Sequence, residues 1–119
     1  MKISAIDNVC FGMAVKATPE AKEFLSERLT KRGIEKFEEL TKFASKDSID
    51  VNLSTETRHL TIGMHKASPY SQLIVSVSNG QNYRFEPGGM SFFIIKAIKK
   101  AVNIAHSLSE HKNRLDNIL

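Results

Sequence analysis

The chain of 119 residues carries a formal net charge of +4, with 41% hydrophobic and 25% charged residues. This length fits one domain with its own core, and the composition excludes a fibrous repeat and a disordered chain. Cys10 is the only cysteine, which excludes an internal disulfide and a multi-cysteine metal site and is typical of a cytoplasmic protein. No apolar run is long enough to cross a bilayer, so we expect neither a membrane span nor a secretory leader.

Positive charge is concentrated in the second half of the chain. Residues 1–47 carry nine Lys or Arg against eight Asp or Glu, whereas residues 48–119 carry eight against five. A basic balance of this kind favours a polyanionic partner, and nucleic acid is the first class to consider.

The first third of the sequence predicts one strand and then two helices. Apolar and small residues alternate over 9–15, which is typical of a strand that is covered on both faces. Thr18 and Pro19 form the N-terminal signal of a helix, which is predicted to end before Gly33. Apolar residues at helical spacing predict a second helix over 34–45.

Period-two alternation then predicts a hairpin and a further strand. Strands are expected over 49–54 and 59–65, joined by a loop around Glu56 and Thr57 that places the apolar residues of both strands on one face. A third strand is predicted over 71–78, after a proline that interrupts the pattern.

The fourth predicted strand contains two aromatic residues whose direction depends on the preceding turn. A two-residue turn at 79–80 would place Tyr83 and Phe85 on the polar face, as an open aromatic platform. A three-residue loop at 78–80 would instead pair Tyr83 with Val75 on the core face. Because burial of a phenylalanine contributes roughly 1.5 to 3 kcal/mol, we favour the core-facing register.

A glycine pair precedes the last helix. Gly88 and Gly89 lack the spacing and the following Lys of a phosphate-binding loop, and they lack the third glycine of a dinucleotide-binding turn. We interpret Pro87 as the end of the strand, the two glycines as the corner, and Ser91 as the cap of the helix.

The last helix has an apolar arc of about 200°, more than contact with one sheet needs. A ridge of small residues with a neighbouring leucine lies within this arc, and it comprises Ala97, Ala101, Ala105 and Leu108. We interpret the ridge as the interface of a homo-oligomer, with the helix pair as the alternative cover. Residues 110–119 are predicted to be a frayed tail or one docked on a partner.

The histidines were considered as metal ligands and as catalytic groups. His59 and His65 are too far apart along one strand to share a metal, and His106 and His111 lie on different faces of the last helix. His59 and Thr61 match half of the motif of two-histidine phosphoesterases, but no second copy occurs. We therefore expect no metal and no cofactor, and an enzyme that uses His59 and Thr61 is the least favoured of three functions.

Lys and Arg side chains on the sheet and on the last helix are the candidate nucleic-acid contacts, because phosphate binding needs cations spread over a surface. These candidates, with one histidine, are Arg58, His59, Lys66 and Arg84 on the sheet and Lys96, Lys99 and Lys100 on the helix.

These observations predict one α+β domain over residues 1–119, in the order β-α-α-β-β-β-β-α, with a mostly antiparallel sheet packed on a long C-terminal helix. The favoured function is a small intracellular, non-enzymatic, homo-oligomeric protein that binds nucleic acid, DNA or RNA, or a protein of a nucleic-acid pathway. The alternative is a homo-oligomeric protein-interaction or inhibitor module that makes no contact with nucleic acid.

Overall fold

The computed structural model describes residues 14–63, 65–78 and 82–118. Its elements, in chain order, are β1 (Val15–Ala17), α2 (Pro19–Arg28), α3 (Lys31–Ala44), β2 (Asp50–Ile62), β3 (His65–Ser78), β4 (Asn82–Phe85) and α4 (Ser91–Ile118). The chain is thus an α+β fold with one four-stranded mixed sheet and a long C-terminal helix on it, which confirms the predicted fold class. Most of the predicted first strand lies outside the described residues.

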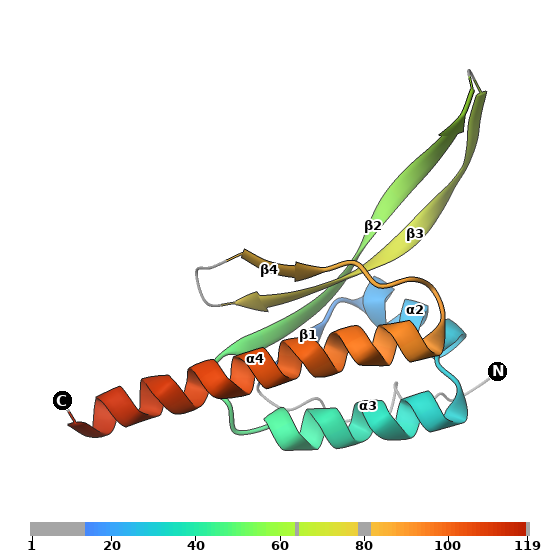
Figure 1. Ribbon diagram of the computed structural model, residues 1–119. Coiled ribbons are helices and arrows are strands. Elements are labelled where there is room, and N and C mark those ends of the chain that lie inside the picture. Colours follow the sequence, from blue (N-terminus) through green and yellow to red (C-terminus); the bar gives the residue numbers. More distant parts are fainter. Residues whose placement is uncertain (1–13, 64, 79–81, 119) are drawn as a thin grey trace.

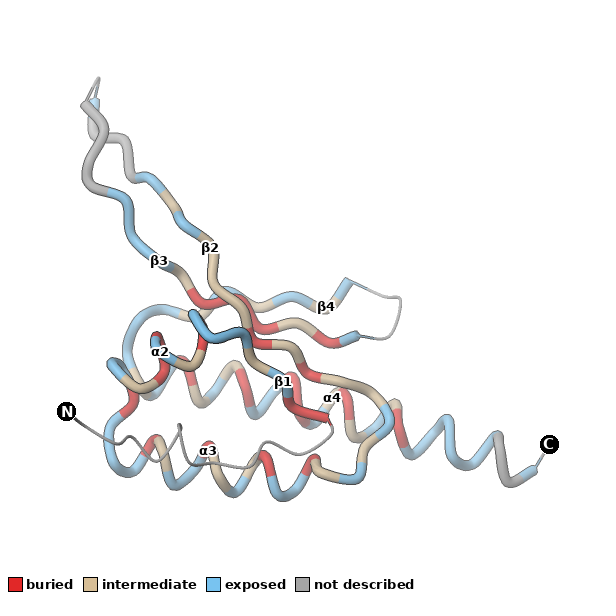
Figure 2. The backbone as a smooth tube through the Cα atoms, turned by 180° about the vertical axis from the view of Figure 1, so that it is seen from behind, coloured by how far each residue is buried: buried red, intermediate tan, exposed pale blue. Residues whose placement is uncertain are grey.

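The sheet and the helices form layers around one core (Figure 1). The strand order is β1-β2-β3-β4, and β1 is parallel to β2 while the other pairs are antiparallel. Helices α2 and α4 lie against one face of the sheet, and α3 packs beside α4. Buried side chains gather where the sheet meets these helices, with Val51, Leu53 and Val75 from the strands and Phe37 and Ile98 from the helices (Figure 2).

The boundary between the first two helices differs from the prediction. Helix α2 ends at Arg28, and Thr30 caps α3 by accepting a hydrogen bond from the backbone N–H of Gly33 at 3.1 Å. Gly33 therefore lies in the first turn of α3 and does not terminate α2. A Cβ at this position would overlap Ser91 Oγ, so the glycine allows the N-terminal ends of α3 and α4 to approach each other closely.

Strands β2 and β3 form one long hairpin, and the predicted loop around Glu56 and Thr57 is wrong. Glu56 pairs with Gln72 and Thr57 with Ser71, in the middle of the ladder. The chain turns instead at Gly63, whose φ of 63° is in the left-handed region that favours glycine. Three strands therefore follow α3 where the alternation predicted four, because the predicted strands over 49–54 and 59–65 fall mainly within the single strand β2.

The outer half of this hairpin extends away from the helices (Figures 1 and 2). None of the described helices covers the strands there, so the alternation of apolar and polar residues no longer indicates a buried face. Pro69 is accommodated within β3, opposite His59 and next to an irregularity in the ladder, where no described strand pairs with the other edge of β3.

The aromatic residues of β4 face the core, as predicted, but their pairing is shifted. Tyr83 lies opposite Val77 and Phe85 opposite Val75, so the predicted pair of Tyr83 with Val75 is wrong. Ser78 belongs to β3, and the shift of two residues along the strand preserves the face because side chains alternate with period two. Both rings are partly buried against the core, so they form no open platform. The conformation predicted for Gly80 lies outside the described residues.

Helix α4 is covered on two sides by the chain itself. Ala101 and Ala105 are fully buried in the core, so they have no surface left for a second copy, whereas Ala97 and Leu108 are only partly buried. Helix α3 provides the second cover, which was the alternative to an oligomer. The helix then continues through the predicted tail to Ile118, and its last turns extend beyond the body of the molecule (Figure 1). Self-association stays a prediction.

Candidate functional site

The arginines predicted to bind phosphate on the sheet are held by carboxylates. Arg58 donates to Glu56 at 3.1 Å and to Glu86 at 2.8 Å, and Arg84 donates to the same two carboxylates at 2.8 and 3.1 Å. The hydrogen bond from Arg84, with the charges of both arginines, holds the pKa of Glu56 below its usual value, so the carboxylate stays charged and competes with any phosphate. The four groups have no net charge together.

The sheet candidates also fail to gather on one surface. Arg58 and Arg84 lie on the face of the sheet opposite the helices, whereas the adjacent His59 belongs to the other face because neighbouring residues of a strand alternate. The side chain of Lys66 lies outside the described residues. The ion-paired sheet therefore contributes no free cluster of cations among the described side chains.

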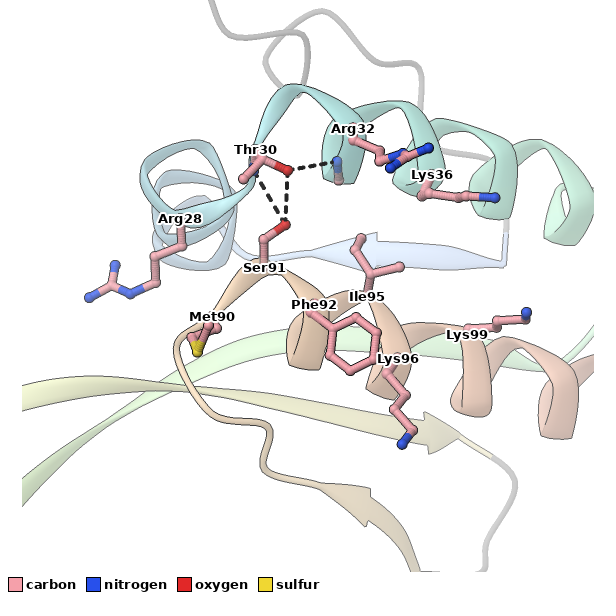
Figure 3. Close-up of a pocket in the computed structure, with 11 residues that line it drawn as sticks. Arg28, Thr30, Arg32, Lys36, Met90, Ser91, Phe92, Ile95, Lys96 and Lys99 are labelled. Carbon is pink, nitrogen blue, oxygen red and sulfur yellow. Dashed lines mark hydrogen bonds between the residues drawn. The ribbon is translucent and has the colours of Figure 1, made fainter.

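A cavity of about 760 Å³ lies between the N-terminal halves of α3 and α4, next to the end of α2 (Figure 3). Its wall is made by eleven residues from these helices and their connections: Arg28, Thr30, Arg32, Gly33, Lys36, Met90, Ser91, Phe92, Ile95, Lys96 and Lys99. Of the three lysines predicted on the last helix, Lys96 and Lys99 belong to this wall. Lys100 points away, with its Nζ 5.8 Å from the centre of the Phe85 ring.

The floor of this pocket is fixed by the junction of two helix ends. The backbone N–H of Thr30 donates to Ser91 Oγ at 3.3 Å, and the two hydroxyl oxygens are 3.4 Å apart. With Gly33 beneath them, these contacts hold the first turns of α3 and α4 side by side. The side chains that follow on the two helices line the pocket between them.

The rim of the pocket is cationic. Five of the lining residues are Lys or Arg, and no carboxylate is present among the described residues that line it. Arg28 pairs with Glu27 at 3.3 Å, and Lys36 lies 3.8 Å from Glu39. In the part of the chain that the structure describes, Arg32, Lys96 and Lys99 form no ion pair with a carboxylate.

Apolar side chains lie exposed between these cations. Met90 and Phe92 are 66% and 67% exposed, which is unusual for large apolar side chains in a folded domain. The Phe92 ring contacts the edge of Phe93 at a centroid distance of 5.5 Å, and the Nζ of Lys96 is 5.9 Å from the ring centre. The pocket therefore combines an aromatic surface with positive charge.

Several residues of the pocket were missed by the sequence analysis. Arg32 and Lys36 were not selected because they are far from α4 in the sequence, and only the fold places them beside it. Phe92 carried a usable signal, since it precedes Lys96 by four residues and Lys99 by seven and so lies on their face of the helix.

A second polar cluster ties the far part of α4 to the loop before β2. His106 Nδ1 is 2.9 Å from Asp47 Oδ1, its Nε2 is 2.7 Å from Glu110 Oε1, and its ring packs on Phe43 at a centroid distance of 4.6 Å. The hydrogen bond to Asp47, followed by the charges of both carboxylates, raises the pKa of His106 above its ordinary 6.5. The Oγ of Ser109 accepts two backbone N–H bonds from the same loop, at 2.9 and 3.0 Å.

This cluster predicts a stability that depends on pH. A histidine whose pKa is raised by folding stabilises the fold fully below its unfolded pKa of about 6.5, and the contribution is lost as the pH rises through the folded pKa. The free energy of unfolding should therefore fall between about pH 6 and pH 8, and His106→Gln should reduce this fall. Urea unfolding at both pH values measures the free energy of unfolding. His111→Gln is the control, because His111 is exposed on the same helix. If the free energy of unfolding falls by the same amount between these pH values in the wild type and in His106→Gln, His106 is not the group responsible for the pH dependence.

The described residues offer no cluster of His, Cys, Asp or Glu that could hold a metal ion. The two carboxylates around His106 contact opposite nitrogens of the ring and so do not converge on one point. Within the same residues, no helix has the length and apolarity needed to cross a membrane.

Comparison with known proteins gives no further guidance. No protein-family model matches the chain, and neither the search of curated proteins nor that of solved structures returned a significant match. The chemistry of the pocket between α3 and α4 is therefore the basis for a functional proposal.

Proposed function

We propose that the protein binds nucleic acid through the pocket between α3 and α4. The observation that carries this proposal is an exposed phenylalanine ring in a pocket that five cations from three helices also line, with no carboxylate among the described lining residues. Phosphate groups supply the negative charge that such a rim attracts, and bases supply the flat apolar surface that suits the ring.

The distribution of charge on α4 supports a partner longer than one phosphate. From Ser91 to Ser109 the helix contains three lysines and no acidic residue, so no carboxylate of this segment offsets the charge of Lys96 and Lys99, and Lys100 adds a further cation outside the pocket. The guanidinium groups of the sheet are neutralised by Glu56 and Glu86, and we therefore remove Arg58 and Arg84 from the proposed contacts. The proposed site is Arg28, Arg32, Lys36, Phe92, Lys96 and Lys99.

The protein is proposed to act by binding rather than by catalysis, in the cytoplasm. The His106 cluster supports this reading because both of its ring nitrogens face carboxylates, which leaves no free nitrogen to serve as a base. A homo-oligomer would place two such pockets on one particle and strengthen binding to a long strand.

The proposal is tested by binding of a fluorescein-labelled mixed-sequence RNA and DNA, measured by anisotropy between about 50 and 300 mM KCl. We expect the logarithm of the affinity to fall linearly with the logarithm of salt concentration, with a slope near −0.7 for each phosphate that is neutralised on a single strand. Absence of binding at about 50 mM KCl would refute a nucleic-acid function and favour a protein-interaction module.

A further inference from the structure

We infer that the pocket selects a single strand, with one unstacked base lying on Phe92 and phosphates on the cations of both walls. The inference rests on the proposed function and specifies its ligand. The starting observation is that the pocket is amphipathic, since exposed Met90 and Phe92 lie on the surface that the Lys and Arg side chains surround.

A duplex matches only half of this chemistry. Its phosphates would satisfy the cations, but its base faces are stacked on each other and only their edges are accessible in the grooves. The Phe92 ring would then lie against a charged backbone or water. A single strand exposes the faces of its bases, and every base has a face that can stack on an aromatic ring.

The arrangement of the cations is consistent with a strand that follows the groove. Arg32 and Lys36 extend from α3 on one wall, and Lys96 and Lys99 extend from α4 on the other (Figure 3). The Nζ of Lys96 lies over the Phe92 ring, 5.9 Å from its centre, so this lysine would lie beside a base that stacks on the ring. The cavity of about 760 Å³ is within the usual size range of sites for small organic ligands, of which a nucleotide is one.

The test separates bases from phosphates. Three labelled probes are compared by anisotropy at about 100 mM KCl: a thymidine 12-mer, an abasic 12-mer with the same phosphates, and a 12-base-pair duplex. The wild type is expected to bind the thymidine strand roughly 10- to 100-fold more tightly than the abasic strand, which is the range that stacking of one base provides. The duplex is expected to bind no better than the abasic strand.

Variants of Phe92 identify the ring responsible. Phe92→Leu keeps an apolar side chain but removes the aromatic face, so its affinity for the thymidine strand should fall toward that for the abasic strand, whereas Phe92→Tyr should retain tight binding. Phe43→Leu is the matched control, because Phe43 is also an exposed phenylalanine, 52% accessible, but lies outside the pocket on α3. Thermal unfolding of each variant checks that the fold is kept.

The outcomes distinguish the inference from the proposed function. If the abasic strand or the duplex binds as tightly as the thymidine strand, the inference is overturned while binding of nucleic acid stands. If Phe92→Leu binds the thymidine strand like the wild type, the base does not lie on this ring and the inference also fails. If none of the probes binds but vesicles with anionic phosphatidylserine do, both the inference and the proposed function are wrong.

Discussion

Replacement of Arg32, Lys96 and Lys99 together by Gln is expected to weaken single-strand binding by roughly 10- to 100-fold near 150 mM salt. These three cations line the pocket and form no ion pair among the described residues, so their charge is available to phosphates without the loss of an existing ion pair. If each neutralises about one phosphate, the slope of log affinity against log salt should become less negative by about 2. Fluorescence anisotropy over a series of KCl concentrations measures both effects.

The control for this variant removes the same charge at the other end of the molecule. The control replaces three exposed residues near or beyond the far end of the buried part of α4, namely Lys46, Lys112 and Arg114. Their replacement by Gln also lowers the net charge by three. The fold should persist in both variants, because exposed substitutions usually change the free energy of unfolding by less than about 0.5 kcal/mol each. An equal loss of affinity in the control would mean that net charge, and not the pocket, attracts the strand.

The sequence was a good guide where local pattern and burial agree. Helix α4 begins close to the expected residue, and its wide apolar arc is covered by the sheet and α3. Ser91 was expected to cap this helix, but it is the first helical residue, and its Oγ instead accepts a hydrogen bond from the backbone N–H of Thr30. The face of Tyr83 and Phe85 was also correct, although the pairing was not, because burial determines the face and leaves shifts of two residues open. Patterns of apolar residues that mark a buried surface were therefore sufficient to predict which face of an element is buried.

The long hairpin and the pocket could not be predicted for related physical reasons. In the outer half of β2 and β3 no helix covers the strands, so polar residues such as Glu56 and Thr57 fit a strand as well as a loop. The pocket combines residues 28–36 with residues 90–99, and these segments are brought together only in the folded chain, by contacts such as that between Thr30 and Ser91. Charge alone also misled. Arg58 and Arg84 each have a carboxylate two residues away along the chain, Glu56 and Glu86, and the fold adds the second carboxylate to each arginine from the other segment.

Ala101→Arg is expected to unfold the monomer. Ala101 is fully buried in the core, with no accessible surface, so an arginine there must either displace its neighbours or bury a charge that has no partner. Overpacking costs about 1 to 3 kcal/mol and an uncompensated buried charge about 3 to 5 kcal/mol, together comparable to the 5 to 15 kcal/mol that stabilise a typical domain. Far-UV circular dichroism and thermal unfolding measure this loss.

Asn103→Arg provides the comparison, because Asn103 is exposed two residues further along the same helix and should accept the same side chain with little effect on stability. Sedimentation of both variants and of the wild type also tests whether the alanine ridge lies at an interface between two copies of the chain. If the wild type is a dimer and Ala101→Arg is a folded monomer, the alanine ridge lies at an interface between copies and its burial within one chain is wrong. If Ala101→Arg loses its secondary structure while Asn103→Arg keeps it, α3 and the sheet are what cover this ridge, and any second copy must contact a different surface.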